Sequence, residues 1–204
     1  MSERAGFDEL VPGFYAENDR ERRLAKDPVI LKGLAWGQPR EGHPEGRVGM
    51  HVAQLLRVID QWGERDPRRR ELRFISLVHD SLKSRVVPLL PKRGDNHHAA
   101  RARRFAEGYT DDERLLATIE LHDAPYAAWR HMRRTGEFDD DRFQRMLAGI
   151  PDLGLFLRFV ELDGSTEGKD AEPLEWLREQ LARHSAAAKA ARRAGSHREP
   201  GDHG

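Results

Sequence analysis

The stretch of sequence that decides the fold is "ELRFISLVHDSLK", residues 71–83. Its apolar residues recur at the three- and four-residue spacing of one buried helical face. They are Leu72, Ile75, Val78 and Leu82. Two polar residues, His79 and Asp80, interrupt this apolar run. Burying such groups without partners costs about 2–7 kcal/mol for a neutral group and more for a charge. The buried His79 and Asp80 therefore need a binding partner that offsets this cost.

Helical periodicity recurs along the chain, and we find no stretch with the apolar–polar alternation of a strand. The clearest case is "VGMHVAQLLRVIDQW", residues 48–62. In "TDDE", Thr110 and Glu113 have the spacing of a capping box, which predicts a helix start there and a helix through residue 123. Further helices are expected over 71–83, 97–108, 126–134, 139–148, 152–163 and 172–184. The pattern predicts an all-α bundle.

The chain length suits a single domain. Residues 1–35 mix charges with short apolar groups and predict an N-terminal extension of short helices. A loop rich in Gly and Pro follows, so the helical domain is expected over 36–184. Residues 185–204 contain no large apolar side chain to bury, which predicts a disordered tail.

The overall composition excludes several functions. Lys plus Arg and Asp plus Glu number 35 each, so the net charge gives no bulk attraction to nucleic acid or acidic membranes. The absence of cysteine excludes disulfides, thiolate zinc sites and cysteine nucleophiles. The chain contains no P-loop motif, no secretory signal pattern at its start and no long apolar run. We therefore expect a cytoplasmic protein without membrane contact, whose oligomeric state the sequence leaves open.

Several predicted helices each place a group that can bind metal on the apolar face. These residues are His51, His79, Asp80, His98, His122 and Asp163. A single histidine of this kind is more often a hydrogen-bonded core residue, and a single aspartate is more often a helix cap. Their recurrence on helix after helix favours a buried divalent cation, with Mn, Fe, Co, Ni and Zn all compatible with imidazole and carboxylate ligands. Core histidines without a metal are the simpler alternative.

His97 and Asp123 each adjoin one of these candidate ligands, and the helical pattern places them less directly. His97 falls on the helical stripe of Arg101 and Arg104, away from that of His98. In "IELHD" a continuous helix lets either His122 or Asp123 point at a given ion, and we expect His122 to be the ligand and Asp123 to lie behind it.

The pattern resembles the HD superfamily of metal-dependent phosphohydrolases, which is named for a histidine, a later His-Asp pair and a final aspartate on packed helices. The matching residues are His51, His79, Asp80 and Asp163. "GQPREGHPEGRVGMHVAQLL", residues 37–56, is similar to the entry of the HD domain in bacterial tRNA nucleotidyltransferases. "HDSLK" and "IELHD" are similar to its later elements, and HD modules of RNA end-repair proteins are similar too. The resemblance covers roughly residues 36–169, with Arg47 replacing a commonly acidic residue.

The resemblance implies an HD-domain helical bundle that binds divalent metal ions. We expect two ions per chain. One ion would be bound by His51, His79, Asp80 and Asp163, and the second by Asp80 as a bridge with His98 and His122. It also implies catalytic roles for Lys83 and Asp123. Lys83, Arg101 and Lys169 would bind the substrate.

The expected function is hydrolysis of phosphomonoesters or 2′,3′-cyclic phosphodiesters of nucleotides or RNA ends by a metal-activated water. A 5′-nucleotidase for small nucleotides or deoxynucleotides is the alternative enzyme. A helical binding module that keeps the metal for stability, without turnover, is the alternative of a different class.

Overall fold

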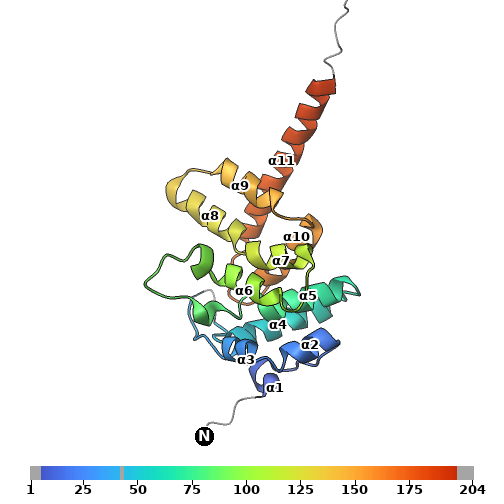
Figure 1. Cartoon of the computed structure of the whole chain (residues 1–204). Coiled ribbons are helices and arrows are strands. Elements are labelled where there is room, and N and C mark those ends of the chain that lie inside the picture. The colour runs from blue at the N-terminus through green and yellow to red at the C-terminus, as the bar shows by residue number, and fades with distance from the viewer. Residues whose placement is uncertain (1–5, 42–43, 197–204) are drawn as a thin grey trace, which may run out of the picture.

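The computed structural model describes residues 6–41 and 44–196, and its regular elements there are all helical (Figure 1). The N-terminal helices are α1 (Phe7–Leu10), α2 (Asp19–Leu24) and α3 (Pro28–Leu34). The central elements are α4 (Val48–Gln61), α5 (Arg68–Val78), η1 (Lys83–Arg85), η2 (Gly94–Asn96), α6 (His98–Ala106) and α7 (Glu113–Leu121). The last helices are α8 (Ala124–Thr135), α9 (Asp140–Ala148), α10 (Leu153–Gly164) and α11 (Glu172–Ser196). The predicted all-α fold is confirmed.

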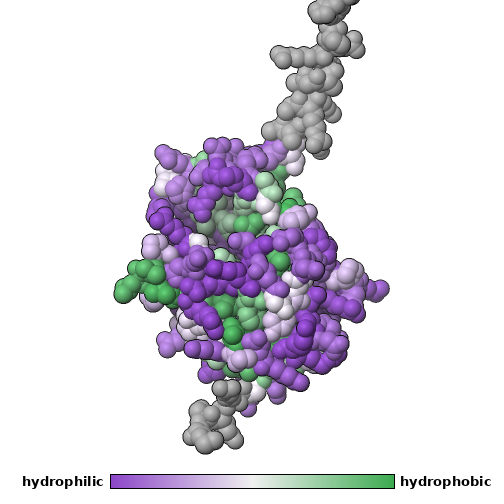
Figure 2. Space-filling view, viewed as in Figure 1, coloured by the Kyte–Doolittle hydropathy of each residue, from purple (hydrophilic) through white to green (hydrophobic). Residues whose placement is uncertain are grey.

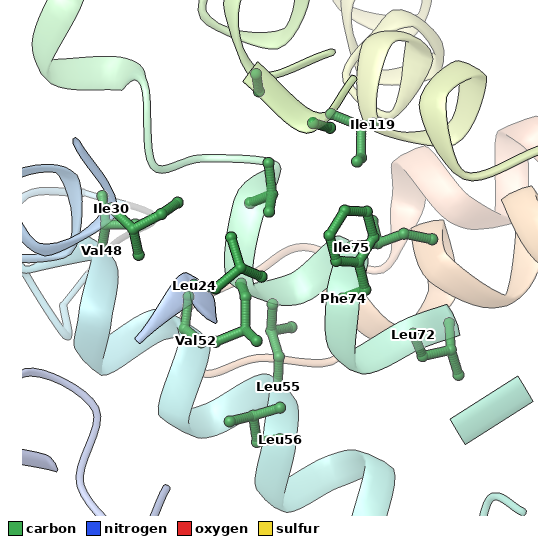
Figure 3. Packing of buried hydrophobic residues seen from close by; sticks show 14 of the residues in the cluster. Leu24, Ile30, Val48, Val52, Leu55, Leu56, Leu72, Phe74, Ile75 and Ile119 are labelled. Carbon is green, nitrogen blue, oxygen red and sulfur yellow. The ribbon is translucent and has the colours of Figure 1, made fainter. Parts of the chain in front are cut away.

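The main apolar core lies where α4, α5, α7 and α10 pack together. Figure 3 shows Leu55 of α4 and Ile75 of α5 within this core, both with no exposed surface. A smaller apolar cluster joins α8, α9 and the start of α11 around Phe143 and Trp176. Among the described residues, no helix combines the length and the apolar character that crossing a membrane requires.

The N-terminal helices belong to the same core. Leu24 and Ile30 are completely buried in the main cluster (Figure 3). Arg73 of α5 donates two hydrogen bonds to the buried carboxylate of Glu21 in α2, at 2.8 and 2.9 Å. The boundary that we predicted at residue 36 therefore does not separate two packing units, because short amphipathic helices bury their apolar sides on whatever core adjoins them.

Two helix ends differ from the predicted ones. Helix α5 ends at Val78 rather than at residue 83, and the Ser81 hydroxyl donates to the Val78 carbonyl at 2.8 Å. Serine competes with the helical backbone in this way. The predicted cap at Thr110 is also wrong, because the N-cap of α7 is Asp112, whose carboxylate accepts a hydrogen bond from the Arg114 backbone N–H.

The last helix runs further than predicted. Helix α11 continues to Ser196, past the expected domain end at 184, and Figure 1 shows it projecting from the body of the molecule. Its second half is rich in alanine, which has the highest helix propensity and forms helix without burying a large side chain. Residues 197–204 of the expected tail lie outside the described residues.

The connection between α5 and α6 forms an apolar protrusion on the surface, visible at the left of Figure 2. Leu89 is 95% exposed at this place. The buried side chain of Asn96 holds the loop: its oxygen accepts from the Val87 N–H at 2.8 Å, and its amide donates to the carbonyls of Val87 and Leu90. This connection leads directly from the His-Asp pair to the His98 helix.

Candidate metal centre

The His-Asp pair lies just after the last turn of α5, in the interior of the molecule. His79 has no exposed surface and Asp80 is 4% exposed. The Nδ1 atom of His79 lies 3.1 Å from the Ser76 carbonyl oxygen and donates to it, which directs Nε2 away from the helix with its lone pair free. His122 makes the same contact, with its Nδ1 at 2.8 Å from the Ile119 carbonyl. Such bonds fix the tautomer and ring orientation of metal-binding histidines.

One group of ligand atoms comes from α4, the end of α5 and α10. The Nε2 atom of His51 lies 2.9 Å from Oδ1 of Asp163, across 112 positions of sequence. The Nε2 atom of His79 lies 3.8 Å from the same Asp163 oxygen and 3.6 Å from Oδ2 of Asp80. The four residues predicted for the first ion therefore lie together.

A second group lies on the other side of Asp80. Oδ1 of Asp80 is 3.3 Å from Nε2 of His98 and 3.7 Å from Nε2 of His122. Asp123 completes this group, with its oxygens 3.1 Å from Nε2 of His98 and 3.6 Å from Nε2 of His122. The two oxygens of Asp80 thus face different histidines, as a bridging carboxylate requires.

The donor set fits divalent cations. Ligand atoms that lie about 2.0–2.2 Å from one ion are about 3–4 Å apart from each other, and nearly all of the distances above fall in this range. Three buried ligand atoms make no hydrogen bond to any described residue: His79 Nε2, Asp80 Oδ1 and His98 Nε2. Buried polar atoms that make no hydrogen bond are costly, and an ion would give these three atoms a direct bond.

The electrostatics of the cluster favour bound positive charge. Burial outweighs the attraction of Asp80 and lowers the pKa of His79 to about 3, so this ring is neutral at pH 7. Burial also opposes the charged form of His122, but the carboxylates of Asp123 and Asp80 raise the pKa of that ring to about 9. Burial opposes ionisation of Asp163 as well, yet His51 holds its pKa well below the usual range. The carboxylates are thus ionised and attract protons or cations.

The predicted substrate-binding residues lie at different places around the cluster. The ammonium group of Lys83 pairs with Oδ2 of Asp80 and is largely buried. Burial opposes its charge, but Asp80 and Asp123 raise the pKa of Lys83, so it stays protonated. Lys169 is close enough to Asp163 to help lower the pKa of that carboxyl. Arg101 lines a separate cavity beside the cluster.

The structure corrects the position of Asp123. We predicted that a continuous helix would keep it behind His122, yet both side chains reach the second group. Helix α7 ends at Leu121 and α8 begins at Ala124, so His122 and Asp123 lie in a turn between helices. Pro125 enforces this break, since it has no N–H and clashes with the carbonyl of the fourth preceding residue. The sequence "HDAP" was the signal that could have revealed it.

Two residues that lie at the candidate metal centre were not among the predicted site residues. Glu45 has a side chain that is 4% exposed, with Oε1 at 3.6 Å from Nδ1 of His51. It comes from the loop before α4, where no periodicity indicates direction. His97 caps α6 by accepting from the Ala99 N–H, and a ring nitrogen of it groups with His98 and Asp123. His43 lies outside the described residues.

The cluster is closed on one side and accessible on the other. Phe159 packs edge-on against His79, with ring centroids 5.1 Å apart. The side chains of Asp123 and Asp163 are 38% and 23% exposed. Tyr126 is 48% exposed and stacks on Trp129, which packs in the smaller apolar cluster. Solvent therefore reaches the carboxylates of both groups.

Comparison with known proteins leaves the site to be interpreted from its geometry. No family model, curated protein or solved structure gave a significant match to the chain.

Proposed function

We propose that this chain is a metal-dependent phosphohydrolase that cleaves phosphomonoesters or 2′,3′-cyclic phosphodiesters of nucleotides or RNA ends. The observation that carries the proposal is the pair of ligand groups that share Asp80. Such imidazole and carboxylate ligands suit divalent ions of Mn, Fe, Co, Ni or Zn. Ions held by these residues would supply a water of lowered pKa and positive charge for the attacking and leaving oxygens of a phosphoester.

The residues of the chain itself position the substrate. Lys83 keeps a positive charge beside Asp80 and offers it to a phosphate oxygen at the accessible edge of the cluster. Lys169 adds a second positive charge on the Asp163 side. Phe159 excludes water behind His79, which strengthens the electrostatic interactions inside the cluster. Asp123, whose Oδ2 lies 3.1 Å from Nε2 of His98, would add a ligand to the second group.

The test is hydrolysis of a chromogenic phosphomonoester and a chromogenic phosphodiester, with and without added Mn²⁺. We expect activity that a chelator abolishes and Mn²⁺ restores. The variant His79→Ala with Asp80→Ala should lose this activity while its circular dichroism spectrum is unchanged. A matched variant, His131→Ala with Asp111→Ala, removes the same residue types outside the cluster and should keep full activity.

A metal-stabilised binding module without turnover is the second candidate. It is favoured by the way the cluster joins residues from α4, α5 and α10 in the buried interior. If this candidate holds, the His79 and Asp80 variant unfolds at a lower temperature and the wild-type protein hydrolyses neither substrate. If the histidines are ordinary core residues without a metal, a chelator changes neither stability nor activity.

A further inference from the structure

A cavity of about 420 Å³ lies between α6, α3 and the connection from α5 to α6. Its lining residues are Val29, Leu82, Arg85, Asp95, Arg101, Arg104 and Phe105. Three of these side chains carry a positive charge and one a negative charge, so the lining is net positive by two charges.

The charges of the cavity are only partly compensated. Arg104 pairs with Asp95 at 3.0 Å. Arg85 and Arg101 have no carboxylate within ion-pair distance among the described residues, and the buried Nε of Arg101 has no hydrogen-bond partner there. By contrast, Arg103 on the same helix pairs with Glu113 at 2.9 Å. Of the three guanidinium groups that line the cavity, those of Arg85 and Arg101 are therefore left available for an external anion.

The cavity adjoins the metal centre. Leu82 lines it and lies between Asp80 and Lys83 in the chain, so one short turn separates the cavity from the bridging carboxylate. On α6, His98 reaches the centre, and Arg101, three positions later, lines the cavity.

We propose that this cavity binds a second phosphate of the substrate, namely the phosphodiester next to the terminal phosphate that is hydrolysed. The inference rests on the proposed function for the terminal phosphate and narrows its substrate to RNA ends of at least two nucleotides. Arginine suits this role because its planar fork binds two phosphate oxygens at once. Mononucleotides contain no group for the cavity.

The test compares two substrates that differ by one internal phosphodiester. One is a nucleoside 2′,3′-cyclic phosphate or 3′-phosphate, and the other is a dinucleotide with the same terminus. We expect Arg101→Gln to raise KM for the dinucleotide about tenfold more than it raises KM for the mononucleotide. Arg101→Lys, which keeps the charge without the fork, should give a smaller rise. Arg103→Gln is the matched control on the same helix and should change neither KM.

A binding measurement separates this inference from the proposed function. A dinucleoside monophosphate, which has the internal phosphodiester and no terminal phosphate, is titrated into the full chain and followed by NMR. If the dinucleoside monophosphate binds Arg101→Gln more weakly than the wild type and Arg103→Gln, the result supports phosphodiester binding in the cavity. This holds even if the protein hydrolyses neither substrate. Metal-dependent hydrolysis with equal dinucleotide KM values for the wild type and Arg101→Gln overturns the cavity and leaves the proposed function standing.

Discussion

The two carboxylate oxygens of Asp80 face different histidines, with Oδ2 at 3.6 Å from Nε2 of His79 and Oδ1 at 3.3 Å from Nε2 of His98. Asp123 reaches the second group through His98 and His122. The two aspartates therefore differ in what their loss should do. Asp80 belongs to both groups, whereas Asp123 belongs to one.

We expect Asp80→Asn to weaken binding of both ions and Asp123→Asn to weaken binding of one, each by at least about tenfold. Metal content after dialysis against a fixed concentration of Mn²⁺ measures the difference. Asp111→Asn, an exposed change in the loop before α7, is the control. Equal metal content in the Asp80 and Asp123 variants would contradict the bridging role of Asp80.

The residue types of the candidate ligands could be predicted from the sequence, but the directions of their side chains could be predicted only in part. His51 and His79 share helical stripes with leucine, isoleucine and valine, and stripe membership correctly placed them in the interior. Asp123 and Glu45 lie in a turn and a loop, where no periodicity tells which way a side chain points. On a helix, the buried side chains recur at a regular spacing that the sequence shows. In a turn, the direction of a side chain depends on contacts with residues that are distant in sequence.

Among the helices, α7 offers a test of which residue caps its start. Asp112→Ala should destabilise the protein by about 1 kcal/mol at pH 7, because the first turn loses an acceptor for the Arg114 N–H. Thr110→Ala should cost less, since the Thr110 hydroxyl accepts from the Asp112 N–H outside the helix. Chemical denaturation measures both values. A larger loss for Thr110→Ala would contradict the assigned cap.

The Asp112 cap also predicts a pH dependence. Burial opposes ionisation, but the Arg114 side chain and backbone N–H outweigh it and lower the pKa of Asp112 in the folded protein. A lowered pKa gives stability that is present above the unfolded pKa of about 4 and is lost as the pH falls through the folded pKa. The difference in unfolding free energy between wild type and Asp112→Ala should therefore shrink in acid. A constant difference down to pH 2 would exclude this contribution.

Helix α3 is held against the turn that follows the His-Asp pair. A Cβ atom at Gly33 would lie 1.8 Å from the Ser81 carbonyl oxygen, so only glycine permits this approach. Gly33→Ala should destabilise the protein by about 1–3 kcal/mol and lower its metal content, because the turn positions Asp80. Gly164→Ala in α10, where a Cβ meets open space, is the control and should cost nothing. Unchanged stability of Gly33→Ala would contradict this packing.

The helices were better predicted than their ends. The 3.6-residue period located α4, α9 and α10 to within a residue or two, since burial of one face dominates those segments. The position of a helix end depends instead on side chains and prolines that compete with the backbone hydrogen bonds of the helix. The Ser81 hydroxyl closes α5 early and Pro125 forces the break before α8. Both residues were visible in the sequence, but their effect depends on which carbonyl groups need a partner.

For the whole molecule, the described residues from α1 to α7 form one packing unit together with α10. Leu24→Ala in α2 and Leu55→Ala in α4 should each destabilise the protein by about 2–5 kcal/mol and shift one common unfolding transition, because both side chains are fully buried. Leu89→Ala, at a 95% exposed position, should have no effect. A separate early transition in Leu24→Ala would show instead that the N-terminal helices unfold independently.

The central claim is that the buried histidines and aspartates hold divalent ions, and elemental analysis of the purified wild-type chain tests it most directly. We predict close to two divalent ions per chain, in keeping with two ligand groups that share Asp80. A folded protein that contains no divalent metal, and takes up none on dialysis against Mn²⁺ or Zn²⁺, would contradict the account.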